Sequence, residues 1–576
     1  MVADIIRDST VGQIINYVSG GKYLPYAEQR PDFVIPSRFL LPCDKSRPSP
    51  PSNSDTTTVC EDEQQKSLSG AATPSTHLKR ESTIAVDEKF EKQLTDGMIE
   101  LSDPYIVGWY GEDDPDNPRN WSPSKRAFVA FSISLLTFTM YIGSAIYTPS
   151  IPGLMQEFNV SLTHATLGLT LFVMGYAIGP MFLAPFQELP AFGRNTIYIS
   201  TLFLFLIFQI PIITAKNIQT VLAFRFLTGF FGSPALATGG ASMGDIYPVH
   251  QLAYVIGVWA LGAVAGPITG PVVGGFAAQA NGWRWPQYEL IWITGFSCLF
   301  LTLLLPETYE PTILRRRAER LRRLTGNQEL KTKSEKDTEG ETIAQVLKEA
   351  LYRPFVLSVE PVLLFANVYL GFIYAIFYLW FEAFPLVFTD IYHFNLGLSG
   401  LPFLGFLVSG AITYTVYCLY QMYHIAPRSR RAEAAGKQLS PEVRLEIGFM
   451  ASIFIPTSVL IFGFASKPST HWIVPIIGAA LYLPGIFCIF QSLLMYITSA
   501  YPKYAASVLA GNDLARSTIA SVFPLFGHAF FTNLGLGPGS AVLAGISFGL
   551  MAVYAALIKW GHVLRRRSKY AQYSDN

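Results

Sequence analysis

Charged residues are scarce in this sequence. Only 14% of the 576 residues are Asp, Glu, Lys or Arg, whereas an ordinary soluble chain has about 25%. The 42 basic and 41 acidic residues nearly cancel, and a net charge of +1 provides no field that would attract nucleic acid. A water-soluble multidomain enzyme and a nucleic-acid-binding protein are therefore both disfavoured.

The sequence also lacks the clusters that bind metals or phosphates. Its five cysteines are far apart and no histidine lies within four residues of another, so it has no disulfide framework, zinc spacing or H-E-x-x-H motif. It contains no G-x-x-x-x-G-K-[ST] phosphate loop. We therefore expect no catalytic site, no metal and no cofactor, and, if the protein pumps, an ion gradient rather than ATP as the energy source.

Long hydrophobic runs, by contrast, are abundant. A membrane-spanning helix needs about 20 mostly apolar residues, and the sequence has twelve such stretches. They lie near residues 127–148, 165–185, 195–215, 218–241, 253–278, 287–305, 359–381, 396–420, 446–466, 472–497, 505–527 and 538–559. The pattern predicts an all-α membrane protein with twelve transmembrane helices in two six-helix halves.

The polar residues gather in a few segments. The first 126 residues hold 34 of the 83 charges, and residues 306–353 hold 11 basic and 9 acidic ones. Residues 43–80 are rich in Ser, Thr, Pro and charge, a composition that predicts disorder. The expected parts are an amino-terminal tail at 1–126, transmembrane halves at 127–305 and 354–559, a central loop at 306–353 and a carboxy-terminal tail at 560–576.

Basic residues in the loops predict the orientation, because short cytoplasmic loops retain Lys and Arg. The basic residues of one side are Lys125, Arg126, Arg194, Arg315, Arg316, Arg317, Arg320, Arg322, Arg323, Arg428, Arg430, Arg431, Lys437, Arg444, Lys503, Arg565, Arg566, Arg567 and Lys569. The opposite loops contain Lys216, Arg284 and Lys467. We therefore expect both tails and the central loop in the cytoplasm.

Near the amino terminus, four apolar residues share one helical face. They are Val11, Ile14, Ile15 and Val18. This face either rests on the membrane surface or belongs to a short helix with no membrane role.

The fifth hydrophobic stretch carries a regular set of small residues. Gly262, Gly266 and Gly270 are four apart and share a face, and Pro267 and Pro271 follow two of them. Small residues let another helix approach closely, and proline releases backbone carbonyls from the helix. The set indicates either a functional hinge or an ordinary packing face.

A charged residue lies inside the fourth stretch. Arg225 interrupts the apolar run VLAFRFLTGFFGSP, and a charge in the middle of a membrane costs about 2.5–3.5 kcal/mol on insertion scales. We expect its side chain to face the bundle interior or a water-filled cavity. The alternative is an arginine that extends to the membrane surface.

Other ionisable residues near the hydrophobic stretches are few. Asp513 and Arg516 are three apart and can pair on one helix face. Asp245 lies at the end of the fourth predicted helix, and Glu360 and Glu382 lie near the two ends of the seventh. For both glutamates we expect solvation rather than proton carriage.

The loop between the second and third stretches is short. Gly193 and Arg194 follow Glu188, so a charge pair between Glu188 and Arg194 would form an inner gate. The alternative is a plain solvated loop.

With these residues the sequence resembles fungal transporters of the major facilitator superfamily. Gly262, Gly266, Pro267, Gly270 and Pro271 match the G-x-x-x-G-P-x-x-G-P motif of its twelve-helix drug:proton antiporters, and Arg225-Phe-Leu-Thr-Gly229 is similar to their helix 4 motif. The branch that it most resembles is that of yeast multidrug and benomyl/fluconazole resistance transporters. The loop motif after helix 2 departs from the family pattern, because LPAF separates Glu188 from Gly193-Arg194.

The resemblance implies the major facilitator fold, with a central cavity and alternating access. It also implies that Arg225 takes part in proton coupling and that the helix 5 prolines shape and seal the cavity. Candidates for substrate contact, by residue type and depth, are Asn367, Tyr374, Tyr378 and Gln491.

We therefore expect a proton-coupled exporter of small amphipathic toxic compounds, such as azoles and benzimidazoles, that acts as a monomer in the lipid bilayer of the plasma membrane. Its partners would be small-molecule substrates and protons. One alternative is a dedicated exporter of a single metabolite, toxin or polyamine. Another is a membrane sensor that transports nothing, which would be expected to carry a long signalling domain.

Overall fold

The computed structural model describes residues 2–31, 33, 35, 39, 105–337, 339, 343–436 and 440–571. They form two compact units. The larger comprises Met1–Leu24, Pro115–Ile313 and Glu339–Asn576, and the smaller Pro25–Asp114 and Leu314–Thr338. Residues 43–80, for which the sequence predicts disorder, lie outside the described residues.

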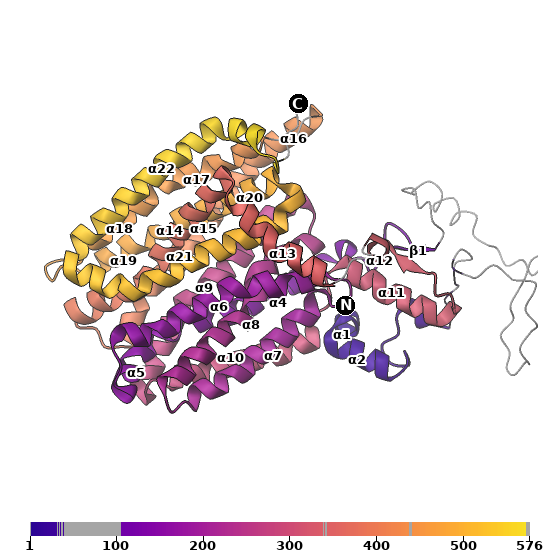
Figure 1. Ribbon diagram of the computed structural model, residues 1–576, viewed down its shortest axis with the longest axis horizontal. Coiled ribbons are helices and arrows are strands. Elements are labelled where there is room, and N and C mark those ends of the chain that lie inside the picture. The colour runs from indigo at the N-terminus through magenta and orange to yellow at the C-terminus, as the bar shows by residue number, and fades with distance from the viewer. Residues whose placement is uncertain are drawn as a thin grey trace, which may run out of the picture. The chain divides into compact units, whose positions relative to one another are not determined.

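The larger unit is a bundle of long helices (Figure 1). Its first half consists of α4 (Pro123–Ala145), α6 (Leu162–Glu188), α7 (Gly193–Ile213), α8 (Ile218–Ile246), α9 (Val249–Asn281) and α10 (Trp285–Leu304), with the short α5 (Ile151–Phe158). The second consists of α14 (Pro361–Phe384), α15 (Leu404–Tyr420), α17 (Leu445–Ser452) with α18 (Phe454–Ala465), α19 (Ile473–Ala480) with α20 (Tyr482–Ala500), α21 (Ala505–Leu534) and α22 (Leu536–Arg567). Each of the twelve predicted stretches therefore overlaps a helix.

Eleven spans in the described residues are long and apolar enough to cross a membrane. The predicted stretch that is not among them, 505–527, is the 30-residue helix α21. Its polar residues, which include Asn512, Asp513 and Arg516, lower its hydropathy. This helix packs against α14 of its own half and against α6 of the other half, so its polar side chains have neighbours inside the bundle.

Proline accounts for two breaks that the sequence analysis does not anticipate. Proline has no N–H to donate to the carbonyl four residues earlier. For Pro456 that carbonyl belongs to Ser452, where α17 ends, and for Pro484 to Ala480, where α19 ends. The predicted spans 446–466 and 472–497 therefore each consist of two consecutive helices.

We call the end of the bundle where α4 and α14 begin and α22 ends the basic end. Three short helices of the larger unit adjoin the long ones there: α1 (Val2–Asp8), α2 (Thr10–Val18) and α13 (Ile343–Ser358). The short helix α16 (Ala426–Ala434) follows α15. Figure 1 shows α1 and α2 beside the helices of the first half.

The smaller unit combines parts of the tail with part of the central loop. Strand β1 (Ile106–Val107) pairs in parallel with β2 (Lys331–Thr332), and the unit also includes α12 (Lys333–Asp337) and most of α11 (Glu310–Thr325). Its apolar core contains Phe39, Val107, Ala318, Leu321 and Leu330. The sequence predicts a polar tail and a polar central loop here, and no folded unit.

Buried ion pairs hold the smaller unit together. Arg317, which the sequence analysis counts among the loop charges, is only 1% exposed. Its guanidinium lies 2.6 Å from Asp114 Oδ2 and 3.0 Å from Glu28 Oε1. The Tyr110 hydroxyl donates to Glu28 at 3.1 Å, and burial raises the pKa of Tyr110 well above its usual value. These contacts join α11 to two parts of the tail, one that contains Glu28 and one that contains Tyr110 and Asp114.

Candidate functional site

Arg225 lies on α8 and is completely buried. Its guanidinium donates three hydrogen bonds to backbone carbonyls: Nε to Gly168 at 3.1 Å, Nη1 to Gly143 at 2.7 Å and Nη2 to Ser144 at 3.2 Å. Arg225 therefore faces the bundle interior, as the sequence predicts, and does not extend to the surface. It ties α8 to both α4 and α6.

The end of α4 compensates the charge of Arg225. Gly143 and Ser144 belong to the last turn of α4, where carbonyls lack partners within the helix and the helix dipole is negative. The Arg225 guanidinium also lies 4.5 Å from the ring centre of Tyr147 and 4.4 Å from that of Phe172. In the described part of the chain no carboxylate forms an ion pair with this arginine.

Tyrosine hydroxyls bridge the two halves of the bundle. Tyr176 of α6 has its hydroxyl 3.0 Å from the hydroxyls of both Tyr374 and Tyr378 on α14. Tyr378 also donates to Ser144 Oγ of α4 at 3.5 Å. The ring of Tyr141 lies 6.0 Å from that of Tyr176. We call Tyr141, Tyr176, Tyr374 and Tyr378 the tyrosine cluster.

A buried ion pair lies beside the tyrosine cluster. Arg516 of α21 donates to Asp513 Oδ1, as the spacing predicts, and Ser517 Oγ donates to the same oxygen at 3.5 Å. The second oxygen, Oδ2, is buried and has no hydrogen-bond partner among the described residues. The Arg516 guanidinium lies 5.5 Å from the ring centre of Tyr374 and 4.6 Å from that of Phe490. One carboxylate oxygen is therefore available inside the bundle.

The two other residues expected to contact substrate are also buried. Asn367 accepts a hydrogen bond of 2.8 Å from Asn512, which joins α14 to α21. Gln491 lies on α20, next in sequence to Phe490. No hydrogen bond within the described residues joins Asn367 or Gln491 to the tyrosine cluster, and their contact with substrate stays a prediction.

Two of the three motif glycines of α9 allow α4 to approach closely. A Cβ atom on Gly266 would lie 2.8 Å from the backbone nitrogen of Ile142, and one on Gly270 would lie 2.6 Å from that of Ile146. A Cβ atom on Gly262 would lie 3.4 Å from its nearest neighbour, an ordinary contact. The close packing is therefore concentrated at Gly266 and Gly270.

The prolines of the motif lie inside α9, which continues past both of them. Pro267 and Pro271 both fall inside Val249–Asn281. The carbonyl of Pro271 closely approaches Gly400 in the segment before α15 of the other half. Pro271 therefore lies at an interface between the halves.

The predicted inner gate has a different carboxylate. Arg194 Nε donates to Asp245 Oδ2 at 2.5 Å, and Nη2 donates to Oδ1 at 3.3 Å. Glu188 makes no hydrogen bond or ion pair with Arg194 in the described residues. Instead, its backbone carbonyl accepts a bond of 2.9 Å from Tyr309, and burial raises the pKa of that tyrosine to about 12. The expected Glu188–Arg194 pair is thus replaced by Asp245–Arg194, because α8 ends beside α7.

Glu307 fixes the backbone at the start of α7. Its carboxylate accepts from the backbone N–H groups of Arg194 and Asn195 at 3.1 and 3.2 Å. It lies close to Gly193, whose φ of +73° is favourable for glycine. Two carboxylates therefore hold the first turn of α7. Glu307 binds its backbone N–H groups, and Asp245 binds the side chain of Arg194.

We expect Asp245→Asn to lower the thermal stability of the protein more than Glu188→Gln does. The first change leaves the buried Arg194 guanidinium without its anionic partner, and breaking a buried pair costs about 3–5 kcal/mol. Unfolding midpoints of the two variants in detergent, each compared with the unchanged protein, test this. Equal midpoints for both variants would contradict the Asp245–Arg194 assignment.

Glu382 is buried rather than solvated. It is 7% exposed, because α14 continues to Phe384 and a π-helical segment follows at Pro385–Ile391. A Cβ atom added to Gly527 of α21 would lie 3.3 Å from the Cβ of Glu382. Glu360 is the half-buried residue that precedes α14. The expectation of solvation is therefore wrong for Glu382.

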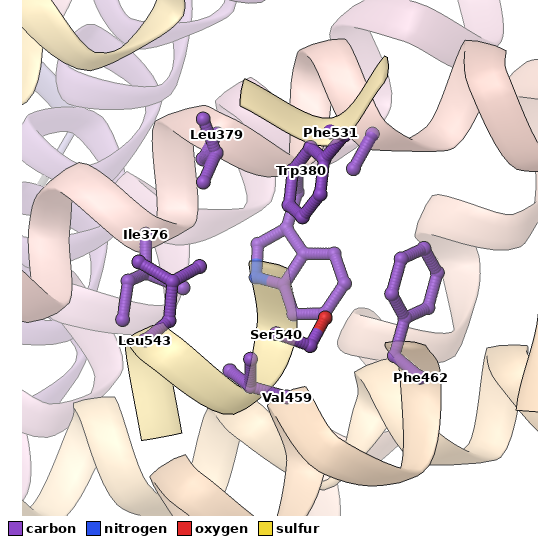
Figure 2. Close-up of a pocket in the computed structure, with 9 residues that line it drawn as sticks. Ile376, Leu379, Trp380, Val459, Phe462, Phe531, Ser540 and Leu543 are labelled. Carbon is purple, nitrogen blue, oxygen red and sulfur yellow. The ribbon is translucent and has the colours of Figure 1, made fainter. Parts of the chain in front are cut away.

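A small apolar pocket lies inside the second half (Figure 2). Its walls come from α14, α18, α21 and α22, and its lining side chains carry two polar groups, the Ser540 hydroxyl and the Trp380 indole N–H. The lining residues are Ile376, Leu379, Trp380, Ala383, Val459, Phe462, Phe531, Ser540 and Leu543. This pocket is separate from the tyrosine cluster at the interface between the halves.

Two halves of membrane-spanning helices that meet at buried polar residues are the arrangement of a class of protein, the membrane transporters. Comparison with known proteins identifies the family. The Major Facilitator Superfamily matches residues 133–524. The chain therefore belongs to the Major Facilitator Superfamily.

Similar proteins include several fungal transporters. "Transporter mfs1" of Schizosaccharomyces pombe is 43% identical over 84% of this chain and 91% of its own length. The "Cycloheximide resistance protein" of Candida maltosa is 37% identical over 99% of this chain and 100% of its own length. "Fluconazole resistance protein 1" of Saccharomyces cerevisiae is 38% identical over 82% of this chain and 86% of its own length.

Among solved structures, the human organic anion transporter MFSD10 (TETRAN) has a similar fold. The TM-score is 0.50 with 14% sequence identity, over 75% of this chain and 100% of that one. The similarity supports the fold alone.

Proposed function

We propose that this protein is a proton-coupled exporter of small amphipathic toxic compounds. The observation that carries the proposal is the tyrosine cluster at the interface between the halves, next to the unpaired Oδ2 of Asp513. Any change in the relative position of the halves must break the hydroxyl contacts between Tyr176 and α14. A substrate and a proton that bind there would both act on the same interface.

The chemistry of the site favours amphipathic compounds. Tyrosine and phenylalanine rings offer flat apolar surfaces, and the hydroxyl groups offer a few hydrogen bonds, which is typical of sites that accept many ligands. Relatives named for resistance to cycloheximide and fluconazole support a toxic compound as the substrate.

Asp513 is the proton-binding residue in this proposal. Protonation of its carboxylate would weaken the pair with Arg516, because the attraction depends on the negative charge. Arg516 would then be held by Tyr374 and Phe490. Proton binding would thus change the contacts of Arg516 with Tyr374, which belongs to the part of the site that faces the substrate.

The proposal includes a location and an orientation. We place the protein in the plasma membrane as a monomer, with the basic end in the cytoplasm, because the loops at that end contain most of the basic residues. Export in this orientation would be driven by protons that enter the cell.

Export from proteoliposomes tests the proposal. The purified full chain, with an imposed proton gradient, is expected to transport fluconazole and cycloheximide, and an uncoupler is expected to stop this transport. Asp513→Asn should lose gradient-driven transport but retain exchange of substrate for substrate, because the variant keeps the tyrosine cluster. Tyr176→Phe is the matched variant that should change substrate preference and remain sensitive to the uncoupler.

Three outcomes would contradict parts of the proposal. Transport that is unaffected by the uncoupler would exclude proton coupling. Transport of one compound from a broad panel would indicate a dedicated exporter. Full gradient-driven transport by Asp513→Asn would show that the proton binds elsewhere.

A further inference from the structure

The burial pattern of α2 is the reverse of that of a helix on a water-soluble protein. Its exposed residues include Ile14 at 57% and Val18 at 78%, and Ile15 is also exposed. The residues that it buries against the protein are Gly12 and Asn16. A helix next to water normally turns its apolar side inward, so this outward face needs an apolar partner.

The rest of the chain holds α2 at the point where α10 leaves the bundle. Ser9 forms a backbone bridge with Pro306, and the N–H of Glu307 donates to the carbonyl of Asp8 at 3.3 Å. The Asp8 carboxylate pairs with Lys125, near the start of α4, at 3.1 Å. Helix α2 itself packs against α10, and Figure 1 shows α1 and α2 at this end of the first half.

Helix α10, against which α2 packs, also has exposed apolar residues. Trp292, Phe296, Leu299 and Leu303 are exposed along this helix, with Leu299 at 65%. In a membrane-spanning helix such residues face lipid. Helix α2 therefore packs on a helix that itself has a lipid-facing surface, and we take lipid as the apolar partner of its exposed face.

We propose that α2 is an interfacial membrane anchor whose Ile14, Ile15 and Val18 insert into the lipid surface beside α10. With nine residues, α2 is about 14 Å long, too short to cross a bilayer, but a helix lying in the interface plane buries one apolar face in lipid. Asp8 and Ser9 would fix its position relative to the membrane. This inference does not depend on the substrate or on proton coupling.

Spin labels on the full chain in lipid nanodiscs test the anchor. The five native cysteines are replaced by serine, and single cysteines are introduced at Ile14 and Val18 for a nitroxide label. Oxygen partitions into lipid, whereas a nickel chelate stays in water, so the ratio of the two accessibilities reports depth. We expect this ratio at both positions to approach that of a label at Leu299, the matched lipid-facing control.

The aqueous control is Glu433 of α16, which is exposed on a polar helix. A ratio at Ile14 and Val18 equal to that at Glu433 would overturn the proposal, because the face would then be in water. Low accessibility to both reagents would also overturn it, since the face would then be covered by protein such as a second copy of the chain. Two labelled positions guard against a local effect of one label.

Discussion

Replacing Arg225 with alanine is expected to abolish export while the protein still reaches the membrane. The change removes three hydrogen bonds to the carbonyls of Gly143, Ser144 and Gly168, and with them the link that Arg225 makes from α8 to α4 and α6. It also removes the positive charge that faces the last turn of α4. Efflux of a labelled compound from cells, normalised to the amount of protein at the membrane, measures the effect.

Two further variants separate the charge of Arg225 from its hydrogen bonds. Arg225→Lys keeps the charge but lacks the planar guanidinium that reaches three carbonyls. Arg225→Gln keeps a donor without the charge. If the charge couples proton movement to export, the lysine variant should retain at least about tenfold more activity than the glutamine variant, a difference of about 1.4 kcal/mol.

Export by Arg225→Gln equal to that of the unchanged protein would assign Arg225 a purely structural role. Size-exclusion profiles of all three variants in detergent are the control for folding. If one variant aggregates, the export activities of the other two are compared with that of the unchanged protein, because each of them differs from arginine in a different property.

The helices of the larger unit could be predicted from the sequence because membrane spans are local features. A run of about 20 mostly apolar residues is sufficient evidence for one helix, and α21 is recognisable as such a run although it contains Asn512, Asp513 and Arg516. The breaks at Ile453 and Leu481 were not predicted, although Pro456 and Pro484 were present, because proline inside a membrane helix does not always end it. Helix α9, which continues through Pro267 and Pro271 without a break, illustrates the difference.

Contacts between distant segments could not be predicted in the same way. The sequence pointed to Tyr374 and Tyr378 by their depth, but nothing local indicated that Tyr176 of the other half would meet them. Sequence proximity favours Glu188 as the partner of Arg194, whereas its partner in the structure, Asp245, lies 51 residues away.

The smaller unit was missed for a related reason. Its core residues come from three separate segments, among them Phe39, Val107 and Leu321. Each segment alone is too polar to suggest a core, and residues 43–80, between two of these segments, have the composition of a disordered chain. Arg317 illustrates the point, because a residue in a run of arginines reads as solvated until its partners Glu28 and Asp114 are known.

Replacing Gly266 with valine is expected to abolish transport by separating α9 from α4. The first atom of any side chain at this position would lie 2.8 Å from the nitrogen of Ile142 and 3.0 Å from the carbonyl oxygen of Phe138. Both are backbone atoms, which cannot move aside as the end of a flexible side chain does, and overpacking of this kind costs about 1–3 kcal/mol or more. Membrane helices depend on such close contact, because lipid provides no hydrophobic force between them.

Gly262 provides the matched control within the same motif. A Cβ atom there would make an ordinary contact of 3.4 Å, so Gly262→Ala should retain transport and thermal stability, whereas Gly266→Ala should lower both and Gly266→Val should lower them further. The measurements are export from cells and the unfolding midpoint in detergent. Normal transport by Gly266→Val would refute the packing argument. Equal losses at both glycines would mean that the motif acts through the whole face of α9 rather than through its closest contacts with α4.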